Sequence, residues 1–252
     1  MRACLVLLAL VVTSSASAQG NEKFTGSNVD VRTGLTFKAS DSAVQKMLPA
    51  GWEVNSPAAG PAKGSNLNMT LIDQVMGRDS EGKPLPPVRG AVLSIPAKKT
   101  GTNAAGNMVF AGLFSQNGAP GAYGVYAPAR FVIDRKQRTE PDGKIAVEES
   151  WELKADDGSA IEVQLAYVRG VVGYSKVEAR IYAAAKPDFF RIYRIEQGVD
   201  VARSVPNNTD QVMKISVKAS GAKLGPLFDG SQQLISVTSI PWYSRQVFLP
   251  AS

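Results

Sequence analysis

The stretch IAVEESWELKADDGSAIEVQLAYVRG, residues 145–170, decides the fold class of this chain. Alternation of apolar and polar residues in its first half places on one face Ile145, Val147, Glu149, Trp151 and Leu153. Alternation in its second half places on one face Ile161, Val163, Leu165 and Tyr167. Between the halves, DDGS at 156–159 has the residue types of a tight turn. The stretch therefore predicts a β-hairpin with one buried face.

The same alternation recurs along much of the chain. It predicts further strands over residues 66–76, 90–98, 106–114, 177–183, 191–197 and 211–219. We expect a helix where Ser40 or Asp41 caps SAVQKML and Pro49 ends it, and a second short helix around 226–234. No long linker divides the sequence. These patterns predict one mainly β domain of the α+β class over residues 19–252, with an antiparallel sheet and a few short helices.

The first 18 residues differ in character from the rest. Arg2 precedes an apolar run over residues 4–12, and ASA at 16–18 forms a small-residue cleavage site, which is the pattern of a secretory signal peptide. The apolar run is shorter than the ~20 residues that a membrane-spanning helix needs. We therefore expect residues 1–18 to be removed and the mature chain to be secreted or periplasmic, with no membrane span.

Missing residue types exclude several chemistries. The chain has no histidine, and its one cysteine, Cys4, lies in the expected signal peptide. Ser-His-Asp and Cys-His catalysis are excluded, as are imidazole and thiolate metal sites in the mature chain. The acidic residues lack calcium-loop spacing, so we predict no metal site and no cofactor. Lys and Arg number 28 against 22 Asp and Glu, but they form no basic tract with interleaved aromatics, so we predict no nucleic-acid partner.

Four segments share features with one enzyme family. AVQKMLPAGWEV at 43–54 combines a short helix, Leu-Pro and a glycine-hydrophobic-glutamate step. AVLSIPAK at 91–98 and MVFAGLF at 108–114 are consecutive strand segments, and LGPLFDGSQQLISVTSIPWYSRQVFLP at 224–250 forms the closing segment. In these segments the chain resembles the acetoacetate decarboxylase-like superfamily. The resemblance implies a barrel-like antiparallel sheet, a lyase ancestry and a tendency to form homo-oligomers.

The catalytic motif of that family is altered in this chain. The motif, Gly-Arg-Glu-x-x-Gly-Phe/Tyr-Pro-Lys-Lys, places a nucleophilic lysine beside a second lysine. The segment PGAYGVYAPARFVIDRK at 120–136 resembles it, with matching residues at Gly121 and Pro128. The altered positions carry Ala122, Tyr123, Ala129 and Arg130, and Gly90 replaces the family's pocket glutamate. An arginine guanidinium stays protonated in proteins, with a pKa above ~12, so Arg130 cannot act as a Schiff-base nucleophile.

The altered segment still offers ligand-binding side chains. If Arg130 faces a barrel interior, it suits a bound carboxylate through paired hydrogen bonds; the alternative is a surface arginine beside a turn. Tyr123 and Tyr126 are candidate pocket walls, and their alternative role is packing. Arg89, next to the altered pocket position, is a further candidate ligand-binding residue. The pair Lys98-Lys99 is a candidate relocated catalytic pair, with a solvated strand end as the alternative.

Glu149 is the acidic residue that the alternation buries. A buried carboxylate is costly unless it is paired or functional, so Glu149 is a candidate catalytic residue. Arg130 of the altered motif is the other candidate catalytic residue. One alternative is that a bulge turns Glu149 outward. The other is a structural ion pair, for which the candidate partners are Arg169, Arg180 and Arg194.

The sequence supports three functional hypotheses. The first is an exported protein that binds a small carbonyl or carboxylate compound in a barrel cavity without Schiff-base decarboxylation. The second is an active lyase of the decarboxylase, aldolase or dehydratase type that uses a relocated lysine or Glu149. The third is a structural or interaction protein without a small-molecule site. Whether the chain is an enzyme stays open at this point, because function depends on the site and not on the fold.

Overall fold

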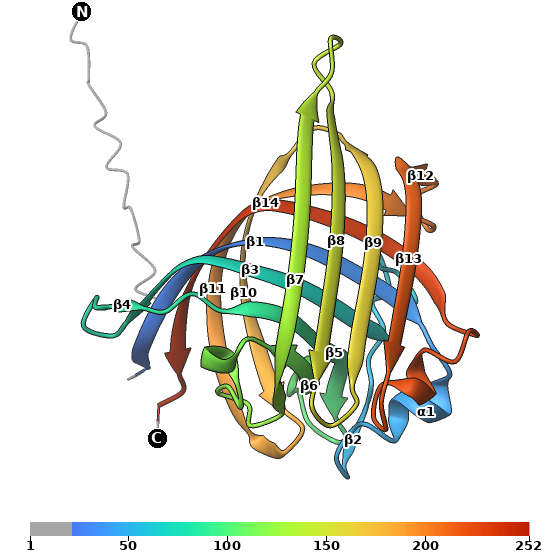
Figure 1. Cartoon of the computed structure of the whole chain (residues 1–252). Helices are drawn as coiled ribbons and strands as arrows, with labels where there is room; N and C mark the ends of the chain where they lie inside the picture. Colours follow the sequence, from blue (N-terminus) through green and yellow to red (C-terminus); the bar gives the residue numbers. More distant parts are fainter. Residues whose placement is uncertain (1–21, 252) are drawn as a thin grey trace, which may run out of the picture.

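The structure is a computed structural model that describes residues 22–251, so the predicted signal peptide over 1–18 lies outside the described residues. Strands make up most of it (Figure 1). In chain order the elements are β1 (Lys23–Lys38), α1 (Asp41–Gln45), β2 (Trp52–Val54), β3 (Leu67–Asp79), β4 (Pro84–Leu85), β5 (Arg89–Lys99), β6 (Ala105–Phe114), η1 (Gln116–Gly118), β7 (Tyr126–Thr139), β8 (Ile145–Ala155), β9 (Ala160–Arg169), β10 (Gly173–Ala183), β11 (Lys186–Ser204), β12 (Thr209–Asp210), β13 (Val212–Ser220), η2 (Gly225–Leu227) and β14 (Gln233–Leu249).

Seven strands of the described chain form a closed ring, which we call the barrel. Their order around the ring is β6, β10, β11, β14, β1, β3 and β5, and β5 pairs back onto β6. All neighbours in the ring are antiparallel except β6 and β10, which run parallel. The ring leaves its strands without a free edge, which removes the usual risk of edge-to-edge association. The expected barrel-like, mainly antiparallel sheet is confirmed.

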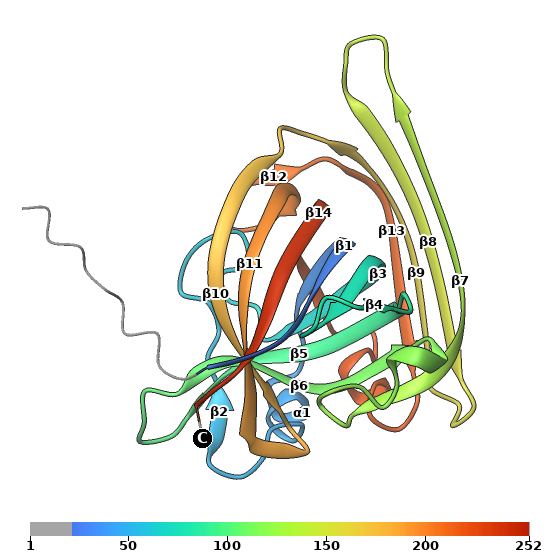
Figure 2. The ribbon, with the colours of Figure 1, turned by 90° about the vertical axis from the view of Figure 1, so that its left-hand side faces the viewer.

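A second layer covers one side of the barrel (Figure 2). It contains β7, β8, β9 and β13, and β7 joins it to the barrel by a short parallel pairing with β6. The main hydrophobic core lies between this outer layer and the barrel, where Leu93, Met69 and Trp151 are fully buried. Full burial of one such side chain contributes ~1.5–3 kcal/mol to folding.

Alternation along each barrel strand separates two environments. On β1, Leu35 and Phe37 face the main core, while Asp30 and Arg32 face the interior of the barrel, which we call the lumen. On β5, Leu93 faces the main core and Val92 faces the lumen. The strand period of two therefore gives β1 and β5 one face in the main core and one face in the lumen.

Most of the predicted elements are present. The predicted hairpin is confirmed. Ile145 of β8 pairs with Arg169 of β9 at one end of the hairpin, and Lys154 pairs with Ala160 at the other. The other six predicted strands overlap β3, β5, β6, β10, β11 and β13, and those over 66–76 and 211–219 begin one residue before the observed strand. The early helix forms but is short, and the helix expected around 226–234 is instead the 3-10 turn η2. The long strands β1, β7 and β14 were not predicted from alternation. The single domain over 19–252 stays a prediction.

Candidate functional site

The lumen contains a cavity of about 690 Å³. All seven barrel strands contribute to its wall, together with the loop 115–125 that connects β6 to β7. One wall residue from each strand in turn is Asp30, Thr70, Val92, Asn107, Ala179, Tyr193 and Tyr243. The volume is in the range of cavities that enclose small molecules.

The cavity wall carries more positive than negative charge. Its charged residues are Arg32, Arg191, Arg245 and Asp30. Asp30 is only 1% exposed and forms an ion pair with Arg32, whose Nε lies 2.8 Å from its carboxylate. Asn28 donates a hydrogen bond to Asp30 and accepts one of 2.6 Å from Nε of Arg245. Asp30 therefore balances one of the three arginines.

Arg191 is the least satisfied of these side chains. Its Nε is buried and has no hydrogen-bond partner, and Arg191 forms no ion pair with any residue in 22–251. Arg191 is half-buried, and the buried part of a cation is costly unless an anion or hydrogen-bond acceptors accompany it. The arrangement favours an anionic group from outside the chain beside Arg191.

Tyrosine rings hold the arginines in position. The guanidinium of Arg32 lies 3.4 Å from the ring centre of Tyr243, and that of Arg245 lies 4.1 Å from the ring centre of Tyr193. The Tyr193 hydroxyl is hydrogen-bonded to the hydroxyl of Tyr123. Stacking on aromatic faces orients a guanidinium without using its N–H groups, so the N–H groups that do not already bond to Asp30 or Asn28 remain available to a ligand.

Tyr126 brings an uncharged hydroxyl to the cavity. Burial raises the pKa of Tyr126 above its ordinary value, and the charges of Arg245, Arg32 and Arg191 act in the opposite direction. Burial likewise raises the pKa of Tyr123, and so do the neighbouring tyrosines. Both hydroxyls therefore stay protonated at neutral pH and serve as hydrogen-bond donors.

Gly121 allows the loop to pack closely on Tyr126. Its φ of 67° lies in the left-handed region, and a Cβ at this position would meet a carbon of the Tyr126 ring at 2.3 Å. The ring of Tyr126 stacks on Phe114, with ring centres 4.4 Å apart. The glycine that matches the family motif therefore has a packing role here.

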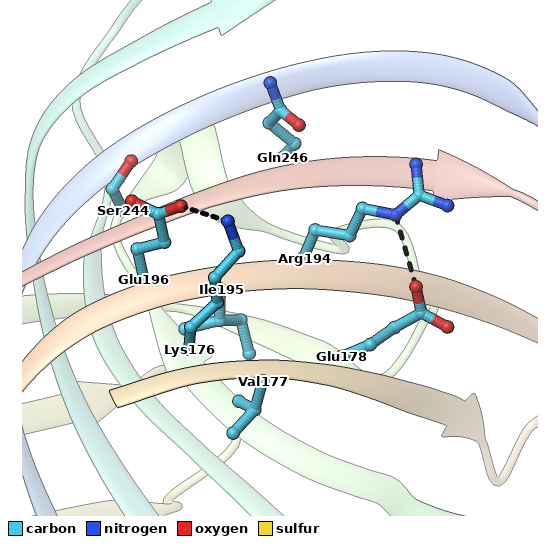
Figure 3. Close-up of a pocket in the computed structure, with 8 residues that line it drawn as sticks. All are labelled: Lys176, Val177, Glu178, Arg194, Ile195, Glu196, Ser244 and Gln246. Atoms are coloured by element: carbon cyan, nitrogen blue, oxygen red, sulfur yellow. Dashed lines mark hydrogen bonds and ion pairs between the residues drawn. The ribbon is translucent and has the colours of Figure 1, made fainter. Parts of the chain in front are cut away.

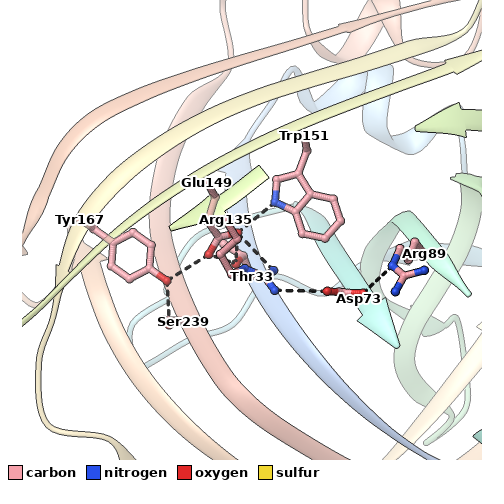
Figure 4. Close-up of polar contacts among 8 residues, drawn as sticks. All are labelled: Thr33, Asp73, Arg89, Arg135, Glu149, Trp151, Tyr167 and Ser239. Atoms are coloured by element: carbon pink, nitrogen blue, oxygen red, sulfur yellow. Dashed lines mark hydrogen bonds and ion pairs between the residues drawn. The ribbon is translucent and has the colours of Figure 1, made fainter. Parts of the chain in front are cut away.

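Glu149 lies outside the lumen, in the core between the barrel and the outer layer (Figure 4). It is 5% exposed, as the alternation predicted. It accepts hydrogen bonds of 2.9 Å from Thr33, 3.0 Å from Nε1 of Trp151 and 3.2 Å from the Tyr167 hydroxyl. Its ionic partner, at 3.5 Å, is Arg135 and none of the three arginines that the sequence suggested. With these partners Glu149 is a satisfied structural carboxylate.

Arg89 belongs to the same polar network and not to the cavity wall. Its Nε lies 2.8 Å from Asp73, which is also 3.4 Å from Arg135 (Figure 4). The network therefore continues from Glu149 through Arg135 and Asp73 to Arg89. Since Arg89 is already paired with a carboxylate, its position does not favour the expected ligand-binding role.

Arg130 lies on the surface. Its side chain is 90% exposed and contacts Asp156, itself 91% exposed, at 3.2 Å. The alternation of β7 explains this position, because Ala129 packs against the main core and Arg130 consequently faces solvent. The expectation that Arg130 faces a barrel interior is therefore wrong, and Arg130 and Glu149 do not share a pocket. Of the expected ligand-binding residues, the structure brings together Tyr123 and Tyr126.

The arginines of the lumen were not predicted as site residues from the sequence, although the pattern around one of them indicated it. RIYRIEQ at 191–197 was predicted as a strand, and its alternation places Arg191 on the same face as Tyr193 and Ile195. An arginine on an otherwise apolar strand face is the same kind of signal that singled out Glu149. Arg245 carried no such signal, because β14 was not predicted.

A second depression, of about 480 Å³, lies on the outer face of β10, β11 and β14 (Figure 3). Its charged side chains are paired with one another. Lys176 lies 2.9 Å from Glu196, and Arg194 lies 3.2 Å from Glu178. Because these charges compensate each other, the depression offers a ligand no surplus charge.

Within residues 22–251, no group of three or more acidic, histidine or cysteine side chains is placed to hold a metal ion. No helix in this part of the chain has the length and apolar character needed to cross a membrane.

Comparisons with known proteins identify the fold. No family model matches the sequence, and no curated protein matches it. Solved structures do match. An acetoacetate decarboxylase-like enzyme from Sphingomonas wittichii RW1 superposes with a TM-score of 0.56 at 9% identity, covering 91% of this chain and 93% of that one. The enduracididine biosynthesis enzyme MppR complexed with pyruvate superposes with a TM-score of 0.58 at 10% identity, covering 98% of this chain and 96% of that one. The fold that the sequence resemblance implied is confirmed.

Proposed function

Because the chain has the acetoacetate decarboxylase-like fold, we propose that it binds a small carbonyl or carboxylate compound in the lumen of its barrel. The surplus of arginine charge around the lumen cavity carries this proposal, and Arg191, buried at Nε and without an ion pair in residues 22–251, is its strongest element. A carboxylate would supply the missing charge and accept the free N–H groups. The aromatic and aliphatic remainder of the wall suits a short carbon skeleton.

Two further observations support a carbonyl or carboxylate ligand. The neighbour MppR has been solved with pyruvate, a small 2-oxo acid. In this chain, Tyr123 and Tyr126 bring hydroxyls to the cavity, and both are protonated at neutral pH, as tyrosine ordinarily is. A protonated hydroxyl can donate to a carbonyl oxygen as well as to a carboxylate.

We further propose that the ligand is bound without a Schiff base. No lysine in residues 22–251 lines the lumen cavity, and the motif's lysine positions carry Ala129 and Arg130. The candidate relocated pair, Lys98 and Lys99, does not favour the lyase hypothesis. At the end of their strand, Lys98 lies 3.2 Å from the carboxylate of Glu53, and Lys99 lies 3.2 Å from that of Asp188. Borohydride reduction in the presence of pyruvate should therefore leave the mass of the protein unchanged, and a lysine adduct located by mass spectrometry would overturn this part.

Calorimetric titration with small keto and hydroxy acids, and with their amides, tests the binding proposal. We expect the acids to bind and the amides to bind at least tenfold more weakly, since a charge-assisted hydrogen bond contributes ~1.5–3 kcal/mol. Arg191→Gln should weaken binding of the acids. Arg130→Gln, which changes an exposed arginine outside the cavity, is the matched control and should bind as the wild type does. Equal loss in both variants, or no binding of any acid, would contradict the proposal.

Export is a separate proposal that rests on the signal-peptide pattern of residues 1–18. It predicts a mature protein that begins at Gln19 and occurs outside the cytoplasm. The N-terminal peptide mass of the protein purified from a native host checks this. A mature protein that retains residues 1–18 would contradict it.

A further inference from the structure

The charged side chains of the lumen wall leave an excess of two positive charges. The wall contains three arginines and one aspartate, and the ion pair between Arg32 and Asp30 removes one charge of each sign. Two positive charges remain, on Arg191 and Arg245. Neither of these forms an ion pair within residues 22–251, and Arg245 contacts the neutral amide oxygen of Asn28. One bound monoanion would leave one of the two uncompensated.

The two uncompensated arginines lie at different points of the wall. Arg191 and Tyr193 are two residues apart on β11 and face the same side, which separates their Cα atoms by ~6.6 Å. Arg245 pairs with Ile195 of β11, two residues further along the strand than Tyr193, and its guanidinium lies 4.1 Å from the Tyr193 ring centre. The backbone positions of the two arginines are therefore about 13 Å apart along the strand direction, with Tyr193 between them. Positions this far apart favour one anionic group at each arginine over a single carboxylate or phosphate group shared by both.

The apolar part of the cavity wall suits a carbon chain with a polar substituent. It includes Val92, Val109 and Ile181, which pack in one apolar cluster with Tyr193. Tyr126 is influenced by the charges of all three arginines, and its hydroxyl has no hydrogen-bond partner in the described part of the chain. A donor without a partner beside an apolar wall can bind a single oxygen on an otherwise aliphatic ligand.

We propose that the ligand of the lumen is a short linear dicarboxylate, with one carboxylate at Arg191 and the other at Arg245. Each carboxylate accepts paired hydrogen bonds from one guanidinium, and the carbon skeleton follows the wall between the two arginines. The two negative charges neutralise the two surplus cations. A keto or hydroxyl oxygen on the skeleton accepts a hydrogen bond from Tyr126. This inference rests on the proposed function and narrows its ligand class from small carboxylates to dicarboxylates.

Calorimetric titration of matched acids at constant pH and ionic strength tests the inference. The dicarboxylates are succinate and glutarate, and the controls are butyrate, the half-amide succinamate and inorganic phosphate. Succinate or glutarate should bind at least tenfold more tightly than butyrate and succinamate, which corresponds to about 1.4 kcal/mol. Arg191→Gln should reduce this preference to within about twofold, while Arg191→Lys, which keeps the charge, should retain part of it.

The outcomes separate the two proposals. If butyrate binds as tightly as succinate and glutarate, or if phosphate binds more tightly than both, the dicarboxylate inference is wrong and the lumen still binds anions as proposed. If none of the acids binds, the proposed function is wrong as well. A dicarboxylate preference that survives Arg191→Gln unchanged would also overturn the inference, because a second site would then be responsible. Far-ultraviolet circular dichroism of each variant verifies that it is folded.

Discussion

Replacing Arg191 by methionine should stabilise the ligand-free protein. Methionine keeps an unbranched side chain that reaches as far as the arginine Nε, and it removes the charge and the N–H groups. In the wild type the buried Nε of Arg191 has no partner, and a buried unsatisfied polar group costs ~1–3 kcal/mol. Arg191 has no ion pair within residues 22–251 that its removal would break. We therefore expect the free energy of unfolding to rise by about 1–2 kcal/mol in Arg191→Met.

Urea denaturation at neutral pH without ligand measures this change, together with two comparison variants. Arg130→Met removes an exposed arginine and should change stability by less than about 0.5 kcal/mol. Arg135→Met removes the ionic partner of the buried Glu149 and should cost about 3–5 kcal/mol. Thermal unfolding should follow the same order, with a gain of about 2–4 °C per kcal/mol for Arg191→Met.

The result that refutes the reasoning is a loss of more than about 1 kcal/mol in Arg191→Met. Arg191 would then be a structural residue with partners that the geometry does not reveal, and its charge would not be reserved for a ligand. A saturating dicarboxylate supplies an independent readout. It should raise the stability of the wild type by mass action and leave Arg191→Met nearly unchanged.

Three other outcomes are expected. Glu149→Gln should destabilise the protein by about 2–3 kcal/mol in urea denaturation, because it leaves Arg135 without its closest buried carboxylate; an unchanged midpoint would contradict the network in Figure 4. Gly121→Ala should lose more than about 1 kcal/mol and weaken ligand binding, since its Cβ displaces the Tyr126 ring; wild-type calorimetry and stability would exclude that packing role. Ultraviolet titration at alkaline pH should show Tyr123 and Tyr126 ionising after exposed tyrosines. Their folded-state pKa values are raised, so the stability that they contribute is present below their unfolded value of ~10 and decreases as the pH rises above it; ionisation at pH 10 in the native state would contradict this.

The predicted hairpin strands have one apolar and one polar face. In β8 and β9 the inner face packs in the main core and the outer face meets solvent, so alternation identifies them. In β1 the second face is the lumen, and its residues there include Asp30 and Arg32. Residues 29–38, VDVRTGLTFK, nevertheless alternate between apolar and polar side chains, so β1 left a signal in the sequence that the prediction overlooked. β7 was missed because most of its residues are exposed, so that it has no consistently apolar face.

The candidate site was predicted only in part, because the cavity forms from strands far apart in the sequence. Tyr123 and Tyr126 were identified from a motif that is continuous in the chain. Arg32 and Arg245 are brought together through the pairing of β1 with β14, and no local pattern reports such a pairing. The motif also misdirected the prediction at Arg130, because a family frame gives a residue's position along a strand and not the direction of its side chain.

The position of β14 in the ring determines when the barrel can close during folding. β14 lies between β1 and β11, so the first and last long strands of the described chain are neighbours (Figure 1). Until residues 233–249 have been synthesised, β1 and β11 each lack a partner along one side. The barrel therefore closes only after nearly the whole chain is available, through contacts between its two ends. Such long-range pairing makes folding slow and late, and an incomplete chain would expose two open strand edges to aggregation.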